Sequence, residues 1–407
     1  MRRYIFILFC AIALPLFSAS VVRQAKDAIK RKSNIEQAIK ALLAEVDKPD
    51  VKPKDKVEYL QLAAECSERL YEIENTKLYL KQKYDTTKFY ASILDIYAHV
   101  LKADSIGASP DEKGRVRPIN RRHNRDFLMP YRTNLLNGGR WHFSGGRMPQ
   151  AYQFFDTYVS VATHPIFARD TLLRADTLIG PTAYLAVVSA YRSQNNDGII
   201  KHASLAKSSH LKSQIVQEYL CKAWQAKGDS VRWLSALEDG LRDYPQHDYF
   251  FSHLIDYYVS ERRFDTALEM TDSMLAKNDS VPLYWYAKSL VLLKQSKDRE
   301  AIDACDSCLA LEPDYVDALY TKGIASLNLA VIYADTACSD LTNPQCRRDQ
   351  EIIRSLYMLA KQPMERVRQL QPDAVTRWAA PLYRIYLNLN MGHEFEEIDY
   401  LLNSQKP

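Results

Sequence analysis

A repeated pattern of small, aromatic and proline residues in the C-terminal half constrains the fold of this 407-residue chain more than any other feature. Counting from Pro282, Trp285 is followed by the small residue Ser289 and, after a polar turn, by Ala301 and Pro313. Small residues let two helices cross closely, and proline ends the second helix so that another hairpin can begin. Each hairpin then leaves an apolar face that only the next hairpin can cover. We therefore expect consecutive helical hairpins that stack on one another.

The same register continues on both sides of this unit. Upstream, Phe251 and Ala267 take the aromatic and small positions of one hairpin, and Pro245 closes the hairpin before it. Downstream, Gly323 lies at the next helix crossing, and an insertion through Arg348 interrupts that unit. The pattern resembles the tetratricopeptide-repeat (TPR) family, whose unit is a helix-turn-helix of about 34 residues. The resemblance implies an all-α fold, an α-solenoid of TPR-like helical hairpins, which serves as a scaffold for another protein.

The resemblance weakens toward the N-terminus, where helical periodicity persists without the repeat pattern. Tyr59, Leu62, Cys66 and Leu70 follow the three- and four-residue spacing of one helix face. We expect four regions: a signal peptide at 1–20, an N-terminal helical region at 21–106, degenerate helical hairpins with an Arg/Gly-rich insertion at 107–210, and a TPR array with C-terminal capping helices at 211–407.

The first twenty residues have the composition of a secretion signal. Arg2 and Arg3 precede an apolar stretch from Tyr4 to Leu16, and residues 18–20 are small, as a signal peptidase requires. The stretch is shorter than the ~20 residues of a membrane-spanning helix, so an uncleaved anchor is the less favoured alternative. We expect an exported protein, periplasmic in a bacterial envelope, with no transmembrane segment in the mature chain and with scope for peripheral association with the envelope.

Charge and composition narrow the class of partner. The formal net charge of +4 becomes 4 − 2 = +2 once Arg2 and Arg3 are removed, which is too small to favour nucleic acid or an anionic membrane as the main partner.

Twelve glycines are few for a chain of strands and tight turns. The 26 tyrosines recur at helical spacing and suit the packing of helix on helix.

Six cysteines follow the predicted signal peptide, an even number that permits disulfides in an oxidising compartment. Cys338 and Cys346 flank a short polar segment and are the candidate disulfide. Cys305 and Cys308 form a CxxC motif, but no second CxxC completes a zinc site. Because both fall on small core positions of the repeat, we expect buried packing thiols rather than a redox pair.

Catalytic spacings are missing from the sequence. It has no GxxxxGK, GxGxxG, GxSxG or HExxH motif. His393 and Glu397 could hold a metal from one helix face, but acidic residues after Gly392 fit the N-terminus of a helix better, where they offset its dipole. We expect no catalysis, no cofactor and no metal site.

One segment, residues 105–150, departs from the helical pattern. Its arginines are candidates for binding a phosphate, an acidic peptide or an anionic glycan, and a solvated loop with a glycine-rich turn is the favoured alternative. The candidate anion-binding residues are Arg115, Arg117, Arg121, Arg122, Arg125, Arg140 and Arg147.

A partner-binding groove is implied by the TPR resemblance, since members of that family bind ligands on the surface formed by their first helices. The lysine and asparagine pair with which some TPR co-chaperones clamp C-terminal peptides is absent from any one repeat. Tyrosines with a few charges suit an extended or helical peptide. The corresponding residues are Glu218, Lys222, Tyr249, Asp256, Tyr286, Leu290, Lys294, Tyr320 and Ile324.

Two functions of different classes follow. The first is an exported TPR scaffold that binds a protein or peptide partner in a cell-envelope assembly. The alternative is a glycan- or peptide-binding protein that uses the segment from Arg115 to Arg147 on a helical platform. An enzyme is the third and least favoured class, because it would need a site that spacing does not reveal.

Overall fold

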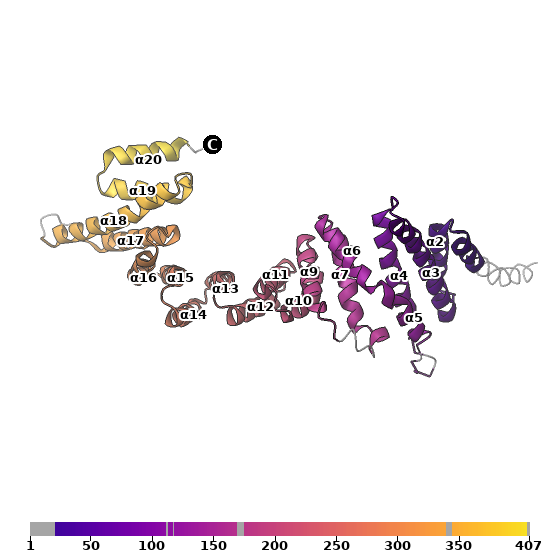
Figure 1. The fold of residues 1–407 in the computed structure, drawn as a ribbon. Helices are drawn as coiled ribbons and strands as arrows, with labels where there is room; N and C mark the ends of the chain where they lie inside the picture. The colour runs from indigo at the N-terminus through magenta and orange to yellow at the C-terminus, as the bar shows by residue number, and fades with distance from the viewer. Residues whose placement is uncertain (1–20, 111–112, 117, 169–174, 339–343, 405–407) are drawn as a thin grey trace, which may run out of the picture. The chain divides into compact units, whose positions relative to one another are not determined.

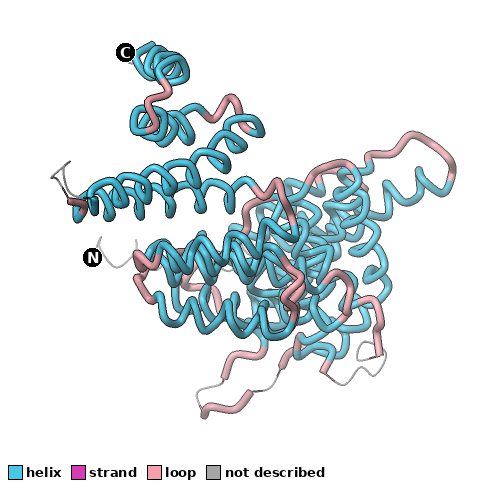
Figure 2. The backbone as a smooth tube through the Cα atoms, turned by 90° about the vertical axis from the view of Figure 1, so that its left-hand side faces the viewer, coloured by secondary structure: helices cyan, strands magenta, loops and turns pink. Residues whose placement is uncertain are grey.

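The computed structural model describes residues 21–110, 113–116, 118–168, 175–338 and 344–404. Helices make up most of these ranges, and no strand occurs within them (Figures 1 and 2). The predicted signal peptide and Arg117 lie outside the described residues. The chain divides into two compact units, residues 1–236 and 237–407, and the division falls inside one helix.

The first unit is a succession of paired helices, with a further helical stretch at residues 21–31. Each helix packs mainly on its neighbours in the chain, and the α3–α4 pair is the most extensive. Its elements are α2 (Ile35–Val46), α3 (Pro53–Tyr79), α4 (Thr86–Gly107), α5 (Arg121–Leu128), α6 (Arg132–Ser144), α7 (Met148–Thr163), α9 (Ile179–Arg192), α10 (Asn196–Ser208), α11 (Ser213–Ala226) and the start of α12 (Ser230–Asp243), with short 3-10 turns at Met129–Tyr131 and Pro165–Phe167.

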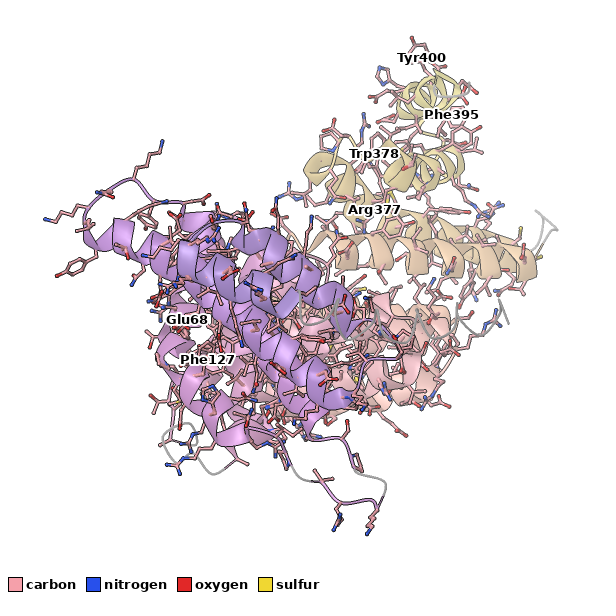
Figure 3. All side chains as sticks on the ribbon, turned by 90° about the vertical axis from the view of Figure 1, so that its right-hand side faces the viewer. Glu68, Phe127, Arg377, Trp378, Phe395 and Tyr400 are labelled. Carbon is pink, nitrogen blue, oxygen red and sulfur yellow. The ribbon has the colours of Figure 1, made fainter. Side chains whose placement is uncertain are left out.

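Side chains of α3 hold the short helix α5 and the turn after it in place. Glu68 accepts a hydrogen bond from the Tyr131 hydroxyl at 2.5 Å, and the Gln61 amide donates to Asn124 at 3.0 Å. Figure 3 labels Glu68 and, on α5, Phe127, whose ring lies 6.1 Å from that of Tyr131. The aromatic and polar contacts together fix the exit from α4 toward α6.

The second unit continues the pairing. A buried core around Trp378, Leu382 and Tyr386 joins its last four helices. Its elements are the end of α12, α13 (Asp248–Ser260), α14 (Phe264–Lys277), α15 (Pro282–Lys294), α16 (Asp298–Leu311), α17 (Val316–Thr336), α18 (Pro344–Leu370), α19 (Val375–Asn388) and α20 (Gly392–Ser404).

Turns within successive hairpins recur every 34 residues. Gln194, Gly228, Arg262 and Ser296 all adopt a left-handed conformation, with φ between 57° and 70°. The N–H of the residue after each one bonds to the carbonyl five residues back, over 2.7 to 3.2 Å. This is the Schellman arrangement that ends a helix. The spacing equals the length of a TPR unit, so the predicted all-α solenoid of TPR-like hairpins is confirmed, and α9 and α10 share its period.

One expectation about an irregular segment was wrong in part. The glycine-rich stretch at residues 137–146 was expected to form a turn, and Gly145 and Gly146 do lie in the turn after α6. Gly138 and Gly139, however, lie buried inside α6, where a Cβ on Gly138 would come within 2.6 Å of the Phe154 ring. The insertion through Arg348 lengthens both helices of its unit, because α17 continues to Thr336 over 21 residues and α18 begins at Pro344 and has 27. The 34-residue spacing is therefore interrupted at this unit, as expected.

Candidate functional site

The first helices of consecutive hairpins in the second unit lie next to one another. Contacts join α13 to α15, α15 to α17, and α17 to α19, although a second helix separates each pair in the chain. Their outward sides therefore form one continuous surface, which we call the first-helix face. We define it by Asp256, Tyr286, Asp317, Tyr320 and Arg377.

Tyr286 on α15 is the centre of this face. Its ring lies 5.2 Å from that of Tyr315, and the side chain is half-buried. Burial, together with the negative charges of Asp317 and Asp256, raises the pKa of Tyr286 to about 12, and only the positive charge of Arg377 opposes them. The hydroxyl therefore stays protonated and lies within electrostatic range of three neighbouring helices.

Arg377 on α19 completes the face. Its guanidinium lies 4.7 Å from the centre of the Tyr320 ring and forms an ion pair with Asp317. A third contact, to the Gln371 side-chain oxygen at 3.3 Å, ties it to the turn before α19. Figure 3 labels Arg377 beside Trp378, whose indole N–H donates to the Gln371 carbonyl at 2.9 Å. These contacts orient the guanidinium over an aromatic ring.

The other predicted groove residues in this unit take more peripheral positions. Tyr249, near the start of α13, packs against His253 with ring centres 4.0 Å apart. Leu290 and Ile324 are half-buried, and Lys294 is exposed at the end of α15. They add apolar area and one positive charge around the central tyrosine.

Glu218 and Lys222 belong to α11 in the first unit. The ammonium of Lys222 pairs with Glu218 and lies 5.7 Å from the centre of the Tyr191 ring. Tyr191 in turn stacks on Tyr219, with ring centres 3.8 Å apart and planes 8° from parallel. Although burial opposes it, the hydrogen bond and charge of Glu218 raise the pKa of Lys222. This cluster repeats the chemistry of the other unit, tyrosine beside paired charges.

Sequence reasoning missed Asp317 and Arg377. Asp317 lies one helical turn before Tyr320, so the 34-residue register could have included it. Arg377 precedes Trp378 in a helix interpreted only as a cap. Its role depends on the tertiary approach of α19 to α17, for which the sequence contains no local signal.

Two of the candidate anion-binding arginines have buried or aromatic partners. Arg121 donates to both carboxylate oxygens of the buried Asp104, at 2.8 and 3.0 Å. Arg147 donates to the His142 ring at 2.9 Å and stacks on Trp141 at 4.0 Å. Burial and the charge of Arg147 hold the pKa of His142 below its usual value, so the ring accepts this hydrogen bond in its neutral form.

The remaining described arginines of that segment lie nearer to solvent. Arg125 pairs with the adjacent Asp126 at 2.6 Å, whereas Arg115, Arg122 and Arg140 are exposed. Anion binding by this segment stays a prediction, with Arg115, Arg122 and Arg140 as its exposed members.

The cysteines of the CxxC motif are buried in α16, as expected. Burial raises the pKa of Cys305 to about 11 and that of Cys308 to about 12, so both remain thiols. The Cys346 sulfur lies 2.9 Å from the Cys338 carbonyl oxygen, and a disulfide between these two stays a prediction. Over the described ranges, no group of His, Cys, Asp and Glu side chains is arranged to hold a metal, and no helix is both long and apolar enough to span a membrane.

No protein-family model and no curated protein matches this chain. Solved structures do match it. The C-terminal part of a TPR repeat-containing protein from Cytophaga hutchinsonii is 11% identical and covers 64% of this chain and 91% of its own, with a TM-score of 0.42. A TPR repeats protein from Bacteroides fragilis is 11% identical over 66% of this chain and 98% of its own, with a TM-score of 0.31. The TPR2AB domain of yeast Sti1, in a complex with pHSP90, is 10% identical over 64% of this chain and 99% of its own, with a TM-score of 0.24.

Proposed function

We propose that this protein is an exported, non-catalytic scaffold that binds a protein or peptide partner in a cell-envelope assembly through its first-helix face. The observation that carries the proposal is the alignment of Asp256, Tyr286, Tyr320 and the Asp317–Arg377 pair on four adjacent first helices. Two tyrosine rings and a stacked guanidinium offer flat surfaces for side chains and peptide groups. The composition of residues 1–20 supports export.

The chemistry of the face favours one kind of peptide. Asp317 is already neutralised by Arg377, whereas Asp256 is exposed and contributes a negative charge near the Tyr286 hydroxyl. A lysine or arginine of the partner would pair with Asp256, and an adjacent aromatic or aliphatic side chain would stack between Tyr286 and Tyr320. An extended or helical segment can present two such groups.

The experiment compares the wild-type mature protein with the double variant Tyr286→Ala plus Tyr320→Ala by crosslinking and co-purification in the native envelope fraction. We expect a defined partner to bind the variant at least about thirtyfold more weakly, because truncation of a central aromatic residue at an interface costs ~2 kcal/mol or more. Tyr333→Ala plus Tyr400→Ala is the matched control, since it removes two rings elsewhere in the same unit.

Equal partner recovery by both double variants and the wild type would reject the first-helix face as the binding surface. Thermal melts of all three proteins separate loss of binding from loss of folding. Cell fractionation with N-terminal sequencing tests export separately: the proposal requires a mature chain that lacks the first ~20 residues in the periplasm.

A further inference from the structure

The tip of the α3–α4 hairpin, residues 78–83, is exposed over six consecutive positions. Its first three side chains are large and apolar: Leu78 is 42% exposed, Tyr79 86% and Leu80 56%. Adjacent exposed apolar side chains of this size are uncommon unless they contact something else. The tip therefore needs an explanation beyond the closure of a hairpin.

The turn itself does not use these side chains. Lys81 has a φ of 55°, and the Gln82 N–H bonds to the Lys77 carbonyl at 2.8 Å, which is a Schellman motif. The apolar contact that often accompanies this motif joins the residues at those two ends, which here are glutamine and lysine. Leu78, Tyr79 and Leu80 are left to face solvent.

Hydrogen bonds to the carboxylates of Glu74 and Asp85 fix the chain on both sides of the tip. The buried carboxylate of Glu74 accepts a hydrogen bond from the Lys77 ammonium at 2.7 Å and another from the Asp85 N–H at 2.8 Å. Asp85 then caps α4 by accepting from the Lys88 N–H at 3.0 Å. Both ends of the turn are thereby fixed, so the apolar side chains are presented on a preorganised loop.

Positive charge surrounds the apolar tip. Lys81 and Lys83 are exposed, and neither forms an ion pair with any described residue. A second turn, with exposed Lys30, Arg31 and Lys32, lies against α3, because Lys32 shares one shallow pocket with Arg69 and Thr76 and another with Lys77 and Lys88. Arg69, Lys77 and Lys88 form ion pairs with Glu72, Glu74 and Glu36, so the excess positive charge near the tip comes from Lys81 and Lys83 and from the turn at residues 30–32.

We propose that the α3–α4 tip docks on the surface of an anionic lipid bilayer. Leucine and tyrosine side chains of this kind insert at the boundary between headgroups and acyl chains, while lysines extend to the lipid phosphates. The apolar triplet favours a lipid surface over a soluble polyanion, and the lysines favour anionic over neutral lipid. The interaction is peripheral and reversible, and it requires no partner on the first-helix face.

The test measures sedimentation of the full-length mature protein with vesicles of phosphatidylcholine alone and with vesicles in which one quarter of the lipid is phosphatidylglycerol. We expect binding to the anionic vesicles that weakens as salt is added. Tyr79→Ser plus Leu80→Ser, and separately Lys81→Glu plus Lys83→Glu, should each weaken it about tenfold, since apolar burial and surface charge both contribute. Matched controls are Leu387→Ser plus Tyr400→Ser, and Lys277→Glu plus Lys297→Glu, which make the same changes at exposed positions elsewhere.

Control variants that bind like the wild type, with both tip variants weakened, would establish the site. The proposal is overturned if the wild type binds neither vesicle, or if either tip variant binds as well as its control. Capture on heparin that the serine variant retains in full, without vesicle binding, would also overturn it and indicate a purely electrostatic site for a soluble polyanion. Because every substituted side chain is exposed, circular dichroism should show the same fold throughout.

Discussion

His99, on α4, is a buried imidazole that lies 3.4 Å from the Ser67 hydroxyl. Burial, and secondly the positive charge of Lys102, lower its pKa from 6.5 to about 4. The unfolded chain therefore binds a proton at this residue between pH 6.5 and 4, while the folded chain does not. The contribution of neutral His99 to the free energy of unfolding is fully present above pH 6.5 and is lost as the pH falls through this window.

We expect the free energy of unfolding to decrease by ~3 kcal/mol at most from this residue across the window, because each pKa unit corresponds to about 1.4 kcal/mol. Urea titrations of the wild type and of His99→Gln at several pH values measure the contribution. The variant should show a shallower loss of stability between pH 6.5 and 4. An identical pH slope in both proteins would mean that the folded state accepts the proton at no cost.

Individual side chains of the repeat pattern were largely predictable. Ser289 and Ala301 are fully buried at the helix crossing, as the register from Pro282 requires. The left-handed conformation of the turn residues was not predictable. Only Gly228 is of a residue type that favours a positive φ, whereas Gln194, Arg262 and Ser296 adopt a similar φ although their side chains disfavour it. Position in the repeat imposes this conformation, so local propensity alone does not reveal it.

At the scale of helices, Gly138 decides how closely α6 can approach its neighbours. A methyl group there would lie 2.6 Å from the Phe154 ring on α7 and 2.9 Å from the Tyr90 ring on α4. The sequence suggested a turn because glycines cluster at residues 137–146, and the facing rings that explain them lie in other helices. Glycine inside a helix thus marks tertiary contact here rather than a break.

Gly138→Ala should destabilise the protein. Alanine favours the helix by about 1 kcal/mol over glycine, but overpacking against the buried Phe154 ring and the half-buried Tyr90 ring costs about 1 to 3 kcal/mol, so we expect a net loss. Thermal or urea unfolding measures it. The control is Gly392→Ala at the start of α20, where no atom lies within 4 Å of the added methyl. A Gly138 variant as stable as this control would show that the Phe154 and Tyr90 rings move aside freely.

At the scale of the whole molecule, the contacts are those of a chain of neighbours. Ion pairs repeat with the hairpins: Lys288 pairs with Asp272, and Lys322 pairs with Asp306 one 34-residue unit later. Helices contact mainly the helices just before and after them, and the first-helix contacts add only the next hairpin. The solenoid and its register were predictable from sequence, but the Arg377 contribution to the first-helix face was not, since it depends on the approach of α19 to α17.

We therefore expect a destabilising substitution to affect mainly its own hairpin and the adjacent ones, because the stability of stacked repeats is a sum of unit and nearest-neighbour terms. Leu382→Ala removes a fully buried side chain from the core shared by α17 to α20 and should cost about 2 to 5 kcal/mol there. Hydrogen exchange of backbone amides should then accelerate in those four helices and remain unchanged in α3 and α4. The reciprocal variant Ile93→Ala, also fully buried, should accelerate exchange in α3, α4 and α7 while α19 and α20 keep their protection. Equal acceleration over both units in either variant would contradict neighbour-limited stability and indicate a single cooperative fold.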